Sequence, residues 1–197
     1  HDKDNQLKYA EQAMVLAREL EYPTLLTRCL RRLAYAYISL REWEKVEQVA
    51  TETHHRFEEV GNLFLANDSL RLVGGCQMRN GRPRESLATH TQCYAFFQQL
   101  QHMWEQAEAG GFLALAHMEL GQYGQAIRLV QESVELARQA NHPMVTILLS
   151  AYGIVYRSIL ALDAAQEAWL TIRRAAAKGD GFDPFPDQTS GELCAIH

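Results

Sequence analysis

The sequence lacks the features that mark membrane, secreted and nucleic-acid-binding proteins. Its most apolar window, residues 144–156, is too short to span a bilayer and is followed by Arg157. No basic segment followed by an apolar one, as in a signal peptide, stands at its start. The formal net charge is −5, whereas a chain that binds nucleic acid needs a basic face. We therefore expect a cytoplasmic protein whose residues here contact neither a membrane nor nucleic acid directly.

Residue patterns for metal binding and catalysis are also scarce. The four cysteines are widely spaced, without a Cys-x-x-Cys pair, which argues against a zinc site or a disulfide framework. His54, His55 and Glu58 place a histidine and a glutamate four residues apart on one helix face, but no second group of ligands accompanies them. No nucleophile is paired with a histidine in a recognisable catalytic pattern. The sequence thus predicts a protein that is not an enzyme, with no catalytic residue, no metal site and no cofactor.

A phosphate-binding loop is missing too, although RLVGGCQMRNGRPRES, residues 71–86, has three glycines and four arginines. A Walker-type loop needs four residues between its glycines, then Lys-Ser/Thr, after a strand. Here five residues separate Gly75 from Gly81, and Arg82-Pro83 follows without a preceding strand. We interpret the stretch as a helix, a turn at Gly81, where a positive φ is often needed, and the start of the next helix at Pro83.

A repeat of 40 residues organises the chain. Turn-like segments recur at 40–43, 80–83 and 120–123, and a fourth follows at 160–162. Apolar residues at helical spacing flank each turn, and alternating strand patterns are absent. This predicts nine helices, at 4–21, 24–40, 43–59, 63–80, 83–101, 103–120, 123–140, 144–160 and 163–177.

These helices form a leading half repeat and four helix pairs. A single pair cannot bury its apolar face, whereas stacked pairs can, so the pattern predicts an all-α solenoid over residues 1–177. Residues 178–197 carry glycines, prolines and aspartates and are expected to be a non-helical tail or linker. Because the first helix lacks its partner, we expect the chain to be a segment of a longer protein. The exposed end of the array is then a candidate for self-association.

The order of small and large residues resembles the tetratricopeptide repeat family, here in a variety with a period longer than the usual one of about 34 residues. ALAHMELGQYGQAIRLVQESVELA, residues 114–137, carries the pattern most fully. Other copies supply Leu30, Leu33, Ala34, Tyr37, Trp43 and Ala50, and then Tyr152, Gly153, Tyr156, Ala165 and Trp169. Gly74 takes the small-residue place held elsewhere by Ala34, Ala114 and Gly153. Arrays with this longer period are similar to those of bacterial signalling and transcription regulators.

The resemblance implies a right-handed superhelix of antiparallel helix hairpins. It further implies a non-catalytic module of a larger bacterial regulatory protein, acting in transcription or signalling and binding a partner in its concave groove. The implied partner is a protein or peptide, with an acidic segment as one form and a small-molecule inducer as an alternative. A stand-alone scaffold or assembly factor, without ligand sensing, is the second interpretation.

In this family the first helix of each pair lines the groove, which assigns groove positions to residues of this chain. The implied partner-binding residues are Arg28, Arg31, Tyr35, Arg71, Met78, Arg79, Leu115, Met118 and Arg157. One hypothesis is that the arginines hold an acidic or C-terminal peptide segment, since guanidinium groups bind carboxylates bidentately. The alternative is an arginine face paired with neighbouring acids of the chain itself. Charge reversal at Arg31 and Arg71 should weaken partner binding and leave the fold intact.

Overall fold

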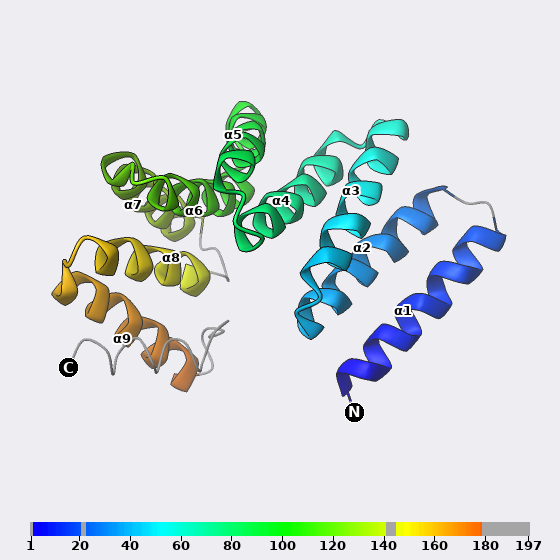
Figure 1. Ribbon diagram of the computed structural model, residues 1–197, viewed down its shortest axis with the longest axis horizontal. Helices are drawn as coiled ribbons and strands as arrows, with labels where there is room; N and C mark the ends of the chain where they lie inside the picture. Colours follow the sequence, from blue (N-terminus) through cyan, green and yellow to red (C-terminus); the bar gives the residue numbers. More distant parts are fainter. Residues whose placement is uncertain (1, 21–22, 141–144, 179–197) are drawn as a thin grey trace. The chain divides into compact units, whose positions relative to one another are not determined.

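Helices account for every element in the computed structural model, which describes residues 2–20, 23–140 and 145–178 (Figure 1). The described residues form α1 (Asp2–Glu19), α2 (Pro23–Leu40), α3 (Trp43–Glu59), α4 (Leu63–Arg79), α5 (Pro83–Gln99), α6 (Met103–Glu119), α7 (Tyr123–Gln139), α8 (Val145–Ser158) and α9 (Leu162–Lys178). The nine predicted helices are confirmed, and the observed ends lie within two residues of the expected ones. The expected tail lies outside the described residues except for Lys178, which ends α9.

The turns between helices that the structure describes share one backbone geometry. A residue with positive φ follows the helix at Arg41, Gly61, Gly81, Gln101 and Gly121, at intervals of 20 residues, and again at Leu160. At the first of these turns, Arg41 N–H donates to the carbonyl of Ile38 and Glu42 N–H to that of Tyr37, at 3.0 and 3.1 Å. This pair of bonds is the Schellman motif, which satisfies the last carbonyls of a helix and reverses the chain. The 40-residue period therefore consists of two helix-turn halves of equal length.

Glycine suits this turn because a side chain is strained at positive φ. Gly81, in the glycine-rich stretch, has a φ of 72°, as the sequence predicted, and Pro83 begins α5. Arg41, Gln101 and Leu160 adopt the same conformation with a side chain, at φ values of 60°, 53° and 61°. These three positions carry strain that the glycine turns do not.

The chain divides into two compact units, His1–Thr89 and His90–His197, with the boundary inside α5, and each unit is described separately. In the first unit α1 packs on α2, α2 on α3 and α3 on α4. In the second unit α6 packs on α7 and on α8, α7 on α8, and α8 on α9. This is consecutive hairpin packing, in which first helices of successive pairs, such as α6 and α8, also meet.

Small residues lie where the helices approach most closely. Ala34 and Ala114 are fully buried, and Gly74 and Gly153 are buried as well. A Cβ added to Gly153 would lie 2.6 Å from Cε2 and Nε1 of Trp169, whose side chain fills the core between α8 and α9. In the first unit Ser86 Oγ donates to the carbonyl of Gly74 at 2.8 Å, which ties α5 to α4. The predicted small-residue places are therefore packing positions.

Two further sequence expectations concern surfaces. Among the described residues, no helix combines the length and apolar character needed to cross a membrane. The first helix exposes Tyr9, Val15 and Leu16, and Leu20 directly follows it; each of these side chains is more than half accessible. Self-association through this face stays a prediction.

Candidate functional site

A cleft on the first unit gathers three of the predicted groove residues. Arg28, Arg31 and Tyr35 line it together with Arg32, all on α2. Phe57 of α3 and Leu65 of α4 complete the lining, and the cavity has a volume of about 660 Å³. Phe57 and Leu65 supply the apolar part of this lining, here called the apolar floor, and the three arginines supply its cationic wall.

A buried carboxylate stands beside this wall. Asp68 of α4 is 4% exposed and accepts hydrogen bonds from two arginines. Arg31 donates to its Oδ2 through Nε at 2.9 Å, and Nη2 of the same guanidinium forms an ion pair with Oδ2 at 2.7 Å. Arg71, one helical turn further along α4, donates to Oδ1 through Nη2 at 2.8 Å. Two guanidinium groups thus share one carboxylate, which links α2 to α4 and leaves a net positive charge.

Arg28 and Arg32 differ from these two arginines. They lie four residues apart, which places them on one face of α2, and both are exposed. Within the described part of the chain, neither has an ion-pair partner, whereas Arg31 is bound to Asp68 and also lies 5.6 Å from the ring centre of Tyr35. Free guanidinium forks beside an aromatic ring and an apolar floor can bind a carboxylate attached to an apolar group.

The remaining predicted residues of the first unit lie further along α4. Arg79, at the end of that helix, stacks over the ring of Trp43 at 4.2 Å, and Met78 beside it is half-buried. The predicted groove arginines of this unit therefore have different surroundings. Arg31 and Arg71 pair with an acid of the chain, and Arg79 packs on an aromatic ring. A charge reversal at Arg31 or Arg71 would face Asp68, so it would disturb the fold, and binding tests belong at Arg28 and Arg32.

The predicted residues of the second unit surround its core. Leu115 and Met118 are partly buried against the cluster around Ala114, Val130 and Val155, and Arg157 is exposed on α8. Ser158 Oγ lies 3.2 Å from Sδ of Met118. The binding role of all nine predicted residues stays a prediction, and Arg28, Arg31 and Tyr35 are the three that share a cavity.

Sequence reasoning missed three residues of the cleft: Arg32, Phe57 and Leu65. The position of Arg32 could have been read from its spacing to Arg28, since residues four apart share a helix face. Phe57 and Leu65 carry no such signal, because they belong to other helices and reach the cleft through packing.

A smaller cavity of about 360 Å³ lies among α7, α8 and α9 of the second unit. Its lining includes Arg138, Tyr152 and Glu167. Burial, with the neighbouring hydroxyl of Tyr156, raises the pKa of Tyr152 to about 12, so this phenol keeps its proton at neutral pH. The two tyrosine rings stack at 4.2 Å, which indicates a packed aromatic pair.

Two of the described cysteines, Cys76 and Cys93, are unsuited to act as nucleophiles. Burial raises the pKa of Cys76 to about 11, and Cys93 is fully buried. A nucleophilic cysteine needs the opposite shift and an accessible sulfur.

Comparisons with known proteins show which solved structures have a similar fold. No protein-family model matches the chain, and no curated protein sequence matches it significantly. Among solved structures, BtubC (BKLC) from P. vanneervenii is 20% identical with a TM-score of 0.73, over 100% of this chain and 83% of that one. A Rap protein complexed with competence and sporulation factor is 15% identical with a TM-score of 0.76, over 86% and 48% of the two chains. Aspartyl phosphate phosphatase F from Bacillus subtilis is 16% identical with a TM-score of 0.73, over 88% and 46%.

At these identities the likeness shows the fold alone. The chain is an all-α array of helix hairpins like those of tetratricopeptide-like repeat proteins. It spans about half the length of the Rap protein and of the phosphatase.

Proposed function

We propose that this chain is a non-catalytic interaction module of a larger regulatory protein, and that its first unit binds an acidic segment of a partner protein or peptide. The cleft lined by Arg28, Arg31, Arg32 and Tyr35 is the binding site. The observation that carries the proposal is the pair of exposed arginines, Arg28 and Arg32, beside an apolar floor and without an acidic partner among the described residues.

The chemistry of the cleft selects the ligand. A carboxylate, either a side chain or a C-terminus, would receive charge-assisted hydrogen bonds from Arg28 and Arg32. An adjacent apolar side chain would pack on Phe57 and Leu65, and the ring of Tyr35 would cover it. Asp68 accepts hydrogen bonds from Arg31 and Arg71 and so fixes the orientation of both guanidinium groups. These bonds also occupy part of the hydrogen-bonding capacity of the two arginines. The free pair therefore supplies most of the attraction.

The comparisons support a binding role without identifying the partner. One matched structure is a Rap protein in complex with a factor, and the matched part is about half of that protein. Because another matched protein is an aspartyl phosphate phosphatase, the absence of catalysis is part of the proposal. Incubation with aspartyl-phosphorylated response regulators should leave their dephosphorylation rate unchanged; acceleration would contradict this part.

The binding proposal can be tested with peptide arrays. Matched peptides that carry Asp or Glu beside Leu or Phe, and their Asn or Gln counterparts, are incubated with the labelled chain. The acidic series should bind preferentially and lose affinity with added salt. In the double variant Arg28→Glu/Arg32→Glu, affinity should fall at least about tenfold, because each charge-assisted bond contributes about 1.5–3 kcal/mol.

Arg84→Glu provides the matched control, since Arg84 is an exposed arginine of the same unit on another helix. It should retain the affinity of the unmodified chain. Equal binding of the acidic and neutral peptides, or equal loss in both charge-reversal variants, would refute the cleft as the binding site.

A scaffold or assembly role is the alternative, and the exposed apolar residues of α1 favour it. Light scattering over a range of concentrations separates the two functions. A scaffold that assembles through this face should form oligomers that Leu16→Lys abolishes, while a monomer at all concentrations would leave peptide binding as the supported role.

A further inference from the structure

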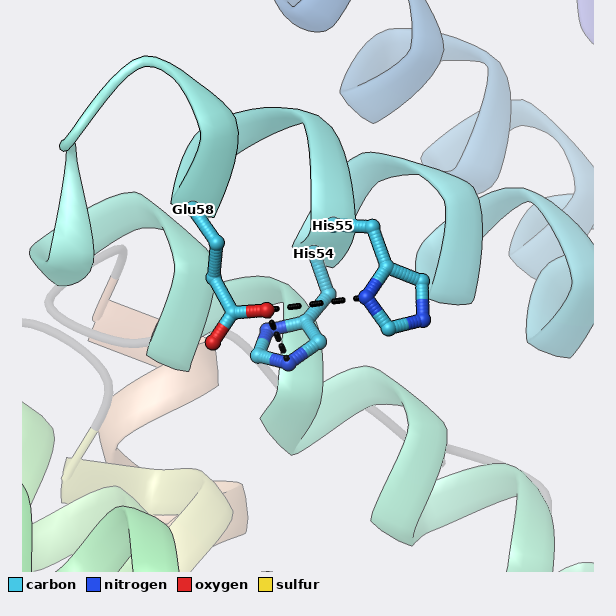
Figure 2. A group of neighbouring side chains, drawn as sticks. All are labelled: His54, His55 and Glu58. Atoms are coloured by element: carbon cyan, nitrogen blue, oxygen red, sulfur yellow. Dashed lines mark ion pairs between the residues drawn. The ribbon is translucent and has the colours of Figure 1, made fainter.

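Three potential metal ligands meet on one face of α3. Glu58 lies one turn beyond His54 and His55, and its carboxylate reaches back to both imidazoles (Figure 2). Glu58 Oε2 is 3.4 Å from Nε2 of His54 and 3.5 Å from Nδ1 of His55. One ligand atom from each residue lies within 4.8 Å of the other two. The sequence analysis named these three residues and predicted no metal site, whereas the fold brings one ligand atom of each together.

The fold holds His54 in the orientation of a metal ligand. Its side chain is largely buried between α3 and α4, and Nδ1 lies 2.9 Å from the carbonyl oxygen of Ala66. A carbonyl oxygen can only accept, so Nδ1 carries the hydrogen of this bond. In the neutral ring the lone pair is then on Nε2, which faces Glu58. A histidine that donates its other N–H to a backbone carbonyl is the usual support of a metal-binding imidazole.

Such a group of acceptors is suited to hold a cation at its centre. A lone pair on His54 Nε2 and a carboxylate oxygen repel each other at 3.4 Å unless a proton or a metal ion lies between them. With metal–ligand distances of about 2.0–2.1 Å, tetrahedral coordination places neighbouring ligand atoms roughly 3.3–3.5 Å apart. The two distances to Glu58 match this separation, and a small rotation of the exposed His55 side chain adjusts the third.

We propose that His54, His55 and Glu58 bind a zinc-type divalent transition metal ion. Two imidazole nitrogens and one carboxylate oxygen suit Zn²⁺, whereas Mg²⁺ and Ca²⁺ prefer oxygen ligands. Because His55 and Glu58 are exposed, at 64% and 46% of their side chains, at least one coordination position is open to water. The site is independent of the arginine cleft, and binding of the ion would stiffen the contact between α3 and α4 through the bond to Ala66.

Metal titration of the tag-free chain tests the site. Co²⁺, a spectroscopic substitute for Zn²⁺, should give the visible absorption of a tetrahedral complex, and Zn²⁺ should displace it. His55→Ala and Glu58→Gln alter exposed side chains, so the helical circular dichroism should not change. Each variant removes one ligand, and affinity should fall by at least about tenfold, the lower limit found even for loss of an outer-shell partner.

His102→Ala is the control, because His102 pairs with Glu105 one turn later without a second histidine beside it. It should bind Co²⁺ and Zn²⁺ as the unmodified chain does. Two results would overturn the proposal: the absence of Co²⁺ absorption and of Zn²⁺ binding by calorimetry, or binding that His55→Ala and Glu58→Gln leave unchanged. The first result would leave the three side chains without a metal-binding role, and the second would place the metal elsewhere.

Discussion

Replacing Asp68 by asparagine should lower the free energy of unfolding of the first unit by about 2–4 kcal/mol. The carboxylate is buried and accepts two charge-assisted hydrogen bonds, one from Arg31 and one from Arg71, and Nη2 of Arg31 forms an ion pair with it. Removing one partner of a buried ion pair costs about 3–5 kcal/mol, because the other charge is left without compensation. The side chain of Arg31 is 39% exposed and can be hydrated, and asparagine keeps one acceptor, so the expected loss is below the upper limit.

Urea denaturation followed by circular dichroism measures this loss, and three variants calibrate it. Arg71→Gln should cost more than Arg31→Gln, because the Arg71 side chain is 11% exposed against 39% for Arg31. Glu85→Gln, which breaks an exposed pair with Arg82, should change stability by less than about 1 kcal/mol. If Asp68→Asn were as mild as Glu85→Gln, the buried linkage between α2 and α4 would have no energetic role.

The same substitution should have the opposite effect on binding. Without Asp68, Arg31 and Arg71 regain hydrogen-bonding capacity, so acidic peptides should bind Asp68→Asn more tightly than the unmodified chain. Fluorescence anisotropy with one labelled acidic peptide compares the two proteins below the urea transition. Weaker binding by a folded Asp68→Asn variant would show that the carboxylate orders the cleft more than it competes with the ligand.

Three further predictions concern packing, turns and pH. Gly153→Ala should destabilise the second unit by about 1–3 kcal/mol relative to Gly124→Ala in urea denaturation. A Cβ at position 153 would overlap the Trp169 ring, whereas a Cβ at position 124 would have no atom within 4 Å. Leu160→Gly should raise stability by about 0.5–1 kcal/mol in the same assay, since the side chain is 81% exposed and φ is 61°. Burial raises the pKa of Cys76 from about 9 to about 11, so between these pH values the native thiol keeps a proton that the unfolded thiol loses. The contribution of this thiol to the free energy of unfolding should therefore be complete below pH 9 and decrease toward pH 11. Urea midpoints measured across this range should fall less in Cys76→Ala than in the unmodified chain.

Local sequence signals were sufficient for the helices and the turns. Apolar residues at helical spacing, glycines at 61, 81 and 121, and Pro83 fix elements whose hydrogen bonds lie within a few residues. The 40-residue recurrence then implied stacking, because no hairpin buries its apolar face alone. The glycine-rich stretch 71–86 was identified in this way as a helix, a turn and the start of the next helix.

The functional surfaces depended on contacts between helices. The sequence left open whether the arginines face a ligand or an acid of the chain, and Asp68, 37 residues beyond Arg31, answers this for Arg31 and Arg71. It also could not predict that Phe57 and Leu65 line the same cleft as Arg28 and Arg32, or that Ala66 orients His54. Periodicity determines which face of a helix is apolar, so it determined the fold. Which side chains meet across that face depends on the packing of residues far apart in the chain, so the tertiary structure decided the sites.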